Sequence, residues 1–161
     1  MRTCVLILCC TVGVSLALPA QPPQQIDFES LESYMDARAN SDSLYVYNFW
    51  ATWCKPCVAE LPYFEQLHRD YASRKVKVIF VSLDFPAFAE ALESFIKKKG
   101  LSAEMLWLVD PDANSWIPKV NEDWSGVIPA TLLLGPSRNI RAFKEQSFTY
   151  DELTQWIQTF I

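Results

Sequence analysis

The sequence is short of glycine, of histidine and of positive charge. Its 161 residues include 4 glycines and 1 histidine, and 14 basic residues are outnumbered by 19 acidic ones. A net charge of -5 gives no electrostatic support for binding nucleic acid, so we expect no nucleic-acid partner. Few glycines beside 10 prolines indicate tight, defined turns rather than flexible linkers. With 50% hydrophobic residues, the chain can bury the core of one compact domain.

The first 20 residues have the pattern of a secretory signal peptide. Arg2 precedes the apolar run CVLILCCTVGVSLAL, which is shorter than the ~20 residues that a helix needs to cross a bilayer. Small residues near its end offer cleavage sites. We therefore expect residues 1–20 to be a signal, 21–26 a short spacer and 27–161 the folded domain. An uncleaved membrane anchor and a lipidated cysteine are the alternatives.

Only two cysteines, Cys54 and Cys57, remain outside that signal. Two cysteines cannot form the disulfide framework of a small secreted scaffold. A zinc site needs four ligands, and the single histidine, His68, lies on the apolar stripe of a predicted helix, where packing is its expected role. Copper is disfavoured because no histidine or methionine lies near the pair. We expect neither a metal nor another cofactor.

Strands and helices alternate along the chain. The sequence at 41–50 is apolar on both faces, which is typical of a central strand. The other strands are predicted at residues 75–84, 104–110, 130–135 and 140–145, the last two as a hairpin. Helices are predicted at residues 27–39, at 55–73 with a kink at Pro62, at 86–99, within 110–120, and after the capping box of Thr149 and Glu152. This order predicts an α/β sandwich with a mixed sheet.

The helix that opens at Pro86 has a clear apolar stripe. It is predicted to end at Gly100, where a glycine can cap the helix after a run of three lysines. The residues of the stripe are Phe88, Ala91, Leu92, Phe95 and Ile96.

The position of the cysteine pair favours redox chemistry. Cys54 follows a buried strand and begins a helix, where free backbone N–H groups and the helix dipole stabilise a thiolate. Lys55 adds a positive charge and Pro56 fixes the first turn. We predict that the pKa of Cys54 lies well below the free-thiol value of about 8.5, and that Cys57 is the less exposed partner.

The stretch FWATWCKPC resembles the active site of the thioredoxin superfamily, and GVIPATLLL is similar to its cis-proline loop. The following CVAELP resembles the secreted TlpA/ResA-type branch, which carries a Glu and a Pro at the positions of Glu60 and Pro62. This resemblance implies a thioredoxin-like three-layer sandwich with a central mixed β-sheet. It also implies an inserted strand–helix element between Cys57 and Pro129.

The resemblance implies a mechanism of disulfide exchange. Cys54 would attack a substrate disulfide, and Cys57 would resolve the mixed disulfide. Thioredoxins proper carry a buried Asp where this chain has Asn48, so no proton-accepting role is assigned there. Glu60 is the substitute candidate, because a carboxylate near buried thiols would have a perturbed pKa. Its alternative is a solvent-facing helix residue.

The resemblance also implies the substrate contacts. The loop with Pro129, whose bond to Ile128 is expected to be cis, would align a substrate strand by backbone hydrogen bonds at Ile128. Trp53, Pro56 and Trp124 are the further candidates for contact with the substrate.

We therefore expect a thiol-disulfide oxidoreductase that reduces protein disulfides outside the cytoplasm, most simply in a bacterial periplasm. Its partners would be protein thiols and disulfides and an upstream thiol-disulfide electron donor, with a membrane-embedded protein as one candidate. The alternative from another class is a thioredoxin-fold binding or chaperone module in which the Cys54–Cys57 disulfide is inert. A peroxiredoxin-type peroxidase is disfavoured, because its Pro-x-x-x-Thr/Ser-x-x-Cys pattern precedes neither cysteine.

Overall fold

A six-stranded mixed sheet forms the middle layer of the protein, whose computed structural model describes residues 23–38, 41–135 and 139–161. Its strand order is β1-β4-β3-β2-β5-β6. The first four strands in this order run parallel, and β5 and β6 are antiparallel to their neighbours. The strands are β1 (Gln24–Ile26), β2 (Leu44–Trp50), β3 (Val76–Ser82), β4 (Glu104–Leu108), β5 (Ala130–Gly135) and β6 (Ile140–Lys144).

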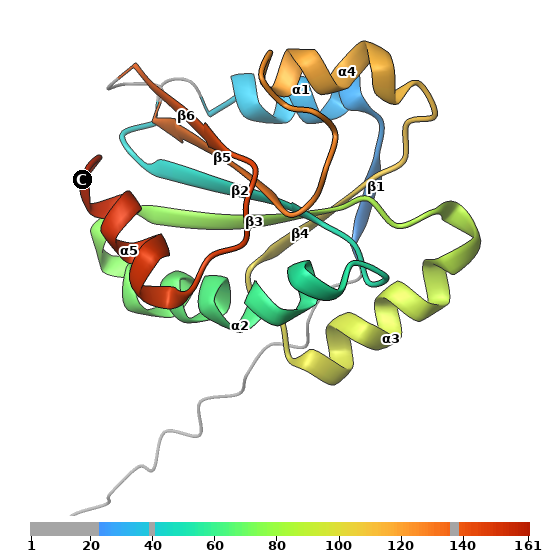
Figure 1. The fold of residues 1–161 in the computed structure, drawn as a ribbon, viewed down its shortest axis with the longest axis horizontal. Coiled ribbons are helices and arrows are strands. Elements are labelled where there is room, and N and C mark those ends of the chain that lie inside the picture. The colour runs from blue at the N-terminus through green and yellow to red at the C-terminus, as the bar shows by residue number, and fades with distance from the viewer. Residues whose placement is uncertain (1–22, 39–40, 136–138) are drawn as a thin grey trace, which may run out of the picture.

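Helices cover both faces of this sheet (Figure 1). Helices α1 and α4 lie on one face, and α2, α3 and α5 lie on the other. The predicted three-layer sandwich with a mixed sheet is confirmed. The α-helices are α1 (Phe28–Asp36), α2 (Lys55–Asp70), α3 (Ala89–Lys99), α4 (Ala113–Val120) and α5 (Tyr150–Gln158), and the 3-10 turns are η1 (Ala72–Arg74) and η2 (Pro86–Phe88).

Strand β2 divides two hydrophobic cores. All seven of its residues are buried, as predicted for a central strand. Because successive side chains point to opposite faces, Val46 and Trp50 join the core under α2 and α3, while Tyr47 and Phe49 join the core under α1 and α4. Asn48 lies between Tyr47 and Phe49, so its side chain points to the α2 side. This alternation brings a polar group from mid-strand to the helix that carries the cysteines.

The short strand β1 corrects the prediction of a simple spacer at residues 21–26. Gln24–Ile26 pairs in parallel with β4, and the carbonyl oxygen of Ile26 accepts a hydrogen bond from the N–H of Val109 at 2.8 Å. Parallel pairing depends on a strand distant in sequence, and a three-residue segment carries no periodicity that would reveal it.

Several local predictions are confirmed at the chain's turns and caps. Gly100 adopts the left-handed conformation at φ +63° and caps α3. Thr149 and Glu152 form the predicted capping box of α5, and β5 and β6 pair as a hairpin. Residues 136–138 of the hairpin turn lie outside the described part. Helix α2 continues through Pro62, and the kink expected there stays a prediction.

The start of α3 differs from its predicted stripe. Residues 86–88 form the 3-10 turn η2, and α3 begins only at Ala89. The 3-10 turn has fewer residues per turn than an α-helix, and this takes Phe88 off the buried face. Phe88 and Ala91 are exposed, whereas Leu92 and Ile96 are buried as predicted.

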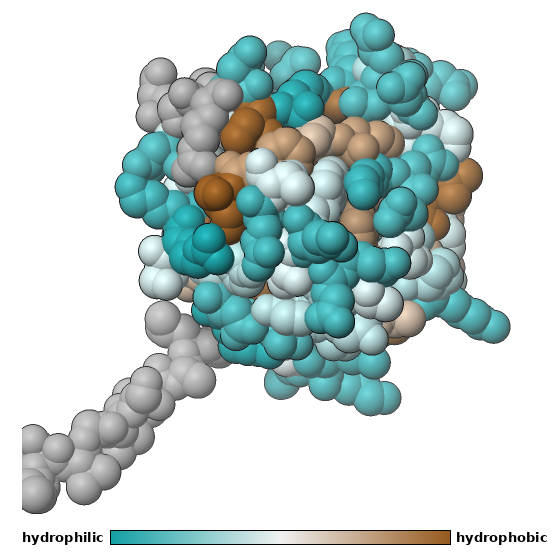
Figure 2. All heavy atoms as spheres, turned by 60° about the vertical axis from the view of Figure 1, so that its left-hand side comes forward, coloured by the Kyte–Doolittle hydropathy of each residue, from teal (hydrophilic) through white to brown (hydrophobic). Residues whose placement is uncertain are grey.

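The predicted signal, residues 1–20, lies outside the described residues and stays a prediction. Across residues 23–38, 41–135 and 139–161, we find no helix with both the length and the apolar character that membrane crossing requires. Figure 2 brings forward the left-hand side of Figure 1, a face on which hydrophilic residues predominate.

Candidate active site

Cys54 and Cys57 lie at the N-terminus of α2 and are joined by a disulfide. Cys54 is the N-cap residue, and its Sγ accepts a hydrogen bond from the N–H of Cys57 at 3.3 Å. Cys54 is 6% exposed and Cys57 is 0% exposed, so the prediction that Cys57 is the less accessible sulfur is confirmed. A helix N-terminus favours a thiolate at Cys54 once the pair is reduced, and the low pKa of that thiol stays a prediction.

The turn between β2 and Cys54 is held by Asp84, which follows β3. Its carboxylate is 2% exposed and accepts hydrogen bonds from the N–H of Thr52, at 3.0 Å to Oδ2, and from the Thr52 hydroxyl. The Ser82 hydroxyl donates to the same carboxylate at 2.8 Å. The N–H of Cys54 donates to the carbonyl oxygen of Ala51 at 3.1 Å, which closes the turn. The turn that presents Cys54 is therefore fastened to the neighbouring parallel strand.

The loop before β5 faces the cysteines. The Ile128–Pro129 bond is cis, as predicted, and the carbonyl oxygen of Ile128 lies 3.7 Å from the Sγ of Cys54. Ile128 is half-buried, Pro129 is buried, and Val127 beside them is 60% exposed. The loop therefore lies against the cysteine pair, where its predicted role in aligning a substrate strand requires it.

Trp124 takes a different place from the predicted one. It is 5% exposed and packs against Phe49, with ring centroids 4.8 Å apart, so little of its surface is open to a substrate. Its Nε1 donates a hydrogen bond to the carbonyl oxygen of Val127 at 2.8 Å. Trp124 therefore supports the Ile128 loop from behind, which corrects its assignment as a substrate contact.

Glu60 is buried on the sheet-facing side of α2, one helical turn after Cys57. It is 1% exposed, so the alternative of a solvent-facing residue is wrong. Its Oε1 accepts from Asn48 Nδ2 at 2.9 Å and its Oε2 accepts from the N–H of Phe148 at 2.8 Å. Burial raises the pKa of Glu60 to about 7, against the lowering effect of these two hydrogen bonds. A carboxyl group with this pKa can take up and release a proton near neutral pH.

The Asn48 amide suits both protonation states of Glu60. Its Nδ2 donates to Glu60 and also lies 3.3 Å from the hydroxyl oxygen of Thr131 on β5. Its Oδ1 is buried and has no hydrogen-bond partner among the described residues. A turned amide would offer this oxygen to a protonated Glu60, whereas the present orientation donates to the carboxylate. An Asp at this position could not donate to a carboxylate while ionised.

Three other residues predicted from the sequence lie at the exposed edge of the site. Trp53 is 54% exposed, and Lys55 and Pro56 are exposed in the first turn of α2. His68 is half-buried further along α2, in agreement with its expected packing role. The tertiary structure thus brings Cys54, Cys57, Glu60, Ile128 and Pro129 together, with Trp53 and Pro56 beside them and Trp124 behind.

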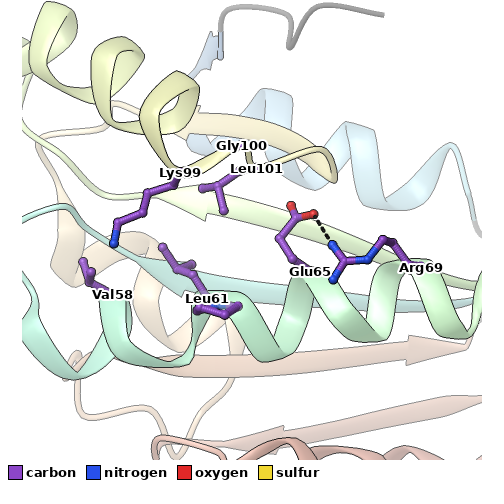
Figure 3. A pocket seen from close by; sticks show the side chains of 8 residues that line it. Val58, Leu61, Glu65, Arg69, Lys99, Gly100 and Leu101 are labelled. Carbon is purple, nitrogen blue, oxygen red and sulfur yellow. Dashed lines mark ion pairs between the residues drawn. The ribbon is translucent and has the colours of Figure 1, made fainter. Parts of the chain in front are cut away.

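A pocket of about 210 Å³ lies between α2 and α3 and includes Val58, the residue after Cys57, in its lining (Figure 3). Glu65 at its edge points toward Arg69, with which it forms an ion pair at 3.7 Å. The carboxylate of Glu65 also accepts hydrogen bonds from the N–H groups of Ser102 and Ala103, at 2.7 and 3.0 Å. These contacts fasten α2 to the segment before β4. Over the part of the chain that the structure describes, no three acidic, histidine or cysteine side chains gather as a metal site would require.

Asp84, Phe85 and Phe88 lie beside the candidate site, although no sequence motif predicts a functional role for them. One signal could have found Asp84: it follows a buried strand, and the carboxyl ends of adjacent parallel strands meet at one edge of a sheet. The two phenylalanines carry no such signal, because an apolar residue beside a predicted helix is expected to be buried.

The model of a family described as "AhpC/TSA family" matches residues 23–143. The thiol-disulfide oxidoreductase ResA of Oceanobacillus iheyensis is 31% identical over 110 residues, which are 68% of this chain and 53% of that protein. ResA of Geobacillus thermodenitrificans is 26% identical over 112 residues, 70% of this chain and 60% of the relative. The chain thus spans little more than half the length of these curated relatives. They confirm the resemblance to the ResA-like branch of the thioredoxin superfamily.

Solved structures share the fold. StoA from Bacillus subtilis superposes with a TM-score of 0.56 at 26% identity, over 73% of this chain and 84% of that one. A thioredoxin-related protein from Neisseria meningitidis serogroup B gives a TM-score of 0.64 at 20% identity, over 74% of this chain and 85% of that one. The second likeness concerns the fold alone, and both support a thioredoxin-like architecture.

Proposed function

The chain belongs to the AhpC/TSA family, and on that premise we propose that it is a thiol-disulfide oxidoreductase. It would exchange the Cys54–Cys57 pair with the disulfides of protein substrates and work as a reductant in an extracytoplasmic compartment. One observation carries this proposal: the more exposed sulfur, Cys54, caps a helix and faces the Ile128 carbonyl oxygen across 3.7 Å. The ResA relatives, named thiol-disulfide oxidoreductases, support the same chemistry.

The reaction begins with the reduced pair. The Cys54 thiolate attacks one sulfur of a substrate disulfide, forms a mixed disulfide and releases the other substrate sulfur as a thiolate. Cys57 then loses its proton to the Glu60 carboxylate and attacks the Sγ of Cys54. The Cys54–Cys57 disulfide forms and the second substrate thiolate leaves. Glu60 passes the proton of Cys57 to one released thiolate, and the other takes a proton from the solvent. Two electrons move from the pair to the substrate, and the protein is left oxidised.

Glu60 is placed in this scheme as the proton acceptor for the buried thiol. Cys57 is 0% exposed, so water has little access to its proton. A carboxylate whose pKa is about 7 accepts that proton without holding it too strongly. The hydrogen bonds from Asn48 and Phe148 hold the carboxylate in place while its charge changes.

The substrate chain would bind along the Ile128–Pro129 loop. Beside Cys54, the carbonyl oxygen of Ile128 can accept a hydrogen bond from the backbone N–H of an extended substrate segment. Trp53 and Pro56 border the same sulfur at the surface. Trp124 acts indirectly, by fixing the carbonyl group of Val127 next to this loop.

The sequence pattern supports the proposed direction and location. Pro56 between the cysteines matches the reducing thioredoxins, and an upstream thiol-disulfide donor, with a membrane-embedded protein as one candidate, would return the pair to its dithiol form. The apolar run within residues 1–20 supports transport across a membrane, most simply into a bacterial periplasm, or retention there by a membrane anchor. N-terminal sequencing of the exported protein would distinguish cleavage from retention.

Insulin reduction by dithiothreitol tests the proposal and separates it from an inert binding module. We expect the wild-type protein to accelerate the precipitation of insulin, and Cys54→Ser to abolish that acceleration. Cys57→Ser should instead accumulate a mixed disulfide that mass spectrometry detects. Ser43→Ala, away from the cysteines, is the matched control and should behave as wild type. A wild-type protein no faster than Cys54→Ser would overturn the proposed activity.

A titration against glutathione buffers tests the direction of electron flow. The fraction of oxidised protein, measured by thiol alkylation and mass spectrometry, gives the reduction potential of the pair. A potential near that of thioredoxin, about −270 mV, is expected of a reductant, and one near that of DsbA, about −120 mV, would contradict it.

A further inference from the structure

Three exposed aromatic side chains form a continuous surface beside Cys54. Trp53, Phe85 and Phe88 are 54%, 60% and 50% exposed. Trp53 and Phe85 stack with their ring centroids 6.2 Å apart and their planes at 18°, and the Phe85 and Phe88 rings are 6.4 Å apart. We refer to these three residues as the aromatic platform. Large apolar patches on a protein surface often mark the sites where partners bind.

The platform is held by the buried contacts beneath it. Thr52 and Asp84 are joined by hydrogen bonds from the backbone N–H and the hydroxyl of Thr52, and each directly precedes a platform ring in the chain. The backbone carbonyl oxygen of Asp84 accepts a hydrogen bond from Trp107 Nε1 at 2.8 Å. The N–H of Leu83 donates to the backbone carbonyl oxygen of Trp50, also at 2.8 Å. The stacking of Trp53 on Phe85 is therefore set by two fixed turns. A surface that is ordered before binding loses less entropy when a partner docks.

We propose that the aromatic platform binds an apolar segment next to the target cysteine of a protein substrate, and so selects substrates among disulfides. The inference rests on the proposed function. Trp53 is adjacent to Cys54 in the chain, so any polypeptide joined to the Sγ of Cys54 has its neighbouring residues within reach of the platform. The Ile128 carbonyl group would align the backbone of the substrate, and the aromatic platform would bind apolar side chains next to its cysteine.

The charges around the platform favour a polypeptide over a lipid surface. Helix α3 follows Phe88 directly and carries the exposed acidic residues Glu90 and Glu93 near its start, whereas its lysines at 97–99 lie in its last turn. On the other side, Lys55 in the first turn of α2 is a single exposed cation two residues after Trp53. Binding of anionic membranes depends on basic residues beside the apolar ones, and these acidic groups would repel the headgroups. A few residues contribute most of the affinity at protein interfaces, and tryptophan is enriched among them.

Two peptide probes test the proposal with the full-length protein. Each carries one cysteine as a mixed disulfide with nitrothiobenzoate, flanked by Leu-Trp-Leu in the apolar probe and by Ser-Gly-Ser in the polar one. Pre-reduced protein attacks the peptide sulfur and releases the coloured nitrothiobenzoate thiolate, and Cys57 then frees the peptide thiol. Stopped-flow absorbance gives the second-order rate constant for each probe.

We expect the wild-type protein to react about tenfold faster with the apolar probe, which corresponds to about 1.4 kcal/mol. In the double variant Phe85→Ser/Phe88→Ser this ratio should fall to about one. Tyr63→Ser is the matched control, because Tyr63 is an aromatic residue 37% exposed on α2 outside the platform, and it should keep the wild-type ratio. Both probes meet the same protein sample, so a loss of folded protein cancels from the ratio.

The outcomes separate the two proposals. A wild-type protein that releases nitrothiobenzoate from neither probe contradicts the proposed function itself. Release from both probes at equal rates, or a double variant that keeps the tenfold ratio, overturns the platform alone. Cosedimentation of the wild-type protein with vesicles of phosphatidylcholine and phosphatidylglycerol, lost in the double variant, would assign the platform to membranes and also overturn the proposal. We expect no cosedimentation.

Discussion

Helix α2 carries two buried glutamates whose surroundings differ. Glu60, near the cysteines, is 1% exposed and accepts two hydrogen bonds, from Asn48 and Phe148. Glu65, near the pocket in Figure 3, is 5% exposed and accepts three, from the N–H and the hydroxyl of Ser102 and the N–H of Ala103. The guanidinium of Arg69 forms an ion pair with Glu65, whereas among the described residues no basic group is paired with Glu60.

The difference shows that burial alone does not make a carboxylate suitable for proton transfer. Burial disfavours the charged form of Glu60, and the two donors around it offset only part of this cost. Glu65 has enough donors and a cation to remain a structural anchor of α2. Glu60 has fewer, and its pKa rises to about 7. Proton transfer is therefore expected at one end of the helix and anchoring at the other.

The largest expected effect is that of Glu60 on the pH dependence of the free energy of unfolding. Because the folded-state pKa of about 7 lies above the ordinary 4.5, the stability due to protonated Glu60 is fully present below about pH 4.5 and is lost as the pH rises through about 7. This loss is on the order of 3 kcal/mol. In urea titrations of the oxidised protein between about pH 5 and 8, Glu60→Gln should gain free energy of unfolding over wild type as the pH rises. If the difference in free energy of unfolding between the variant and the wild type stays constant with pH, the pKa of Glu60 is not raised in the folded protein.

Glu65→Ala should weaken the fold by about 2 to 3 kcal/mol, because it leaves the buried N–H groups of Ser102 and Ala103 without an acceptor. Glu65→Gln is the matched control: its Oε1 can still accept from both groups, so a loss below about 1 kcal/mol is expected. Urea titration at pH 7 measures both. The comparison of the two glutamates fails if Glu65→Ala also moves the pH profile of disulfide reduction.

Glu60→Gln should slow the resolution step by about tenfold at neutral pH, because the amide cannot take the proton of Cys57. The lifetime of the mixed disulfide, measured by acid quench and mass spectrometry, reports this step directly. The wild-type rate should rise with pH through an inflection near the pKa of Glu60, about 7, and the variant should lack this inflection. Glu65→Gln should retain it. An unchanged profile in Glu60→Gln would take Glu60 out of the mechanism.

The smallest effect is expected from Asn48→Ala. Loss of the hydrogen bond from Asn48 Nδ2 removes one contact that lowers the pKa of Glu60, so the inflection should move upward by about half a pH unit, equivalent to about 0.7 kcal/mol. The pH dependence of the resolution rate measures this shift. Movement toward lower pH would mean that Asn48 does not stabilise the carboxylate.

Features defined by short segments could be predicted from the sequence. Cys54 and Cys57 follow a buried strand and begin a helix, and Gly100 and the Thr149–Glu152 box cap helices through contacts a few residues away. The Ile128–Pro129 loop was predicted from its family resemblance, and its cis bond is present. The alternating order of strands and helices was also sufficient to predict a sandwich with a mixed sheet.

Features that depend on distant segments were predicted poorly. β1 needed β4 as its partner, and Trp124 was assigned to the substrate although the packing of Phe49 against its ring buries it. The helical period placed Phe88 in the core, whereas the 3-10 turn before α3 leaves it exposed next to Phe85. A period describes one regular helix and does not reveal where its first turn changes type.

The sequence by itself determined the reactive pair, the order in which its sulfurs are accessible and the helix that presents them, because these depend on residues within one or two turns of each other. The sequence also named Glu60 as the candidate carboxylate, but only the tertiary structure decided that this side chain is buried and hydrogen-bonded, and which aromatic rings stay exposed. The alternation of β2 carries Asn48 to Glu60, and the pairing of β2 with β3 brings Asp84 to Thr52 and Phe85 to Trp53. The pKa of a buried group and the exposure of a ring depend on all the atoms around them, and distant segments supply most of those atoms.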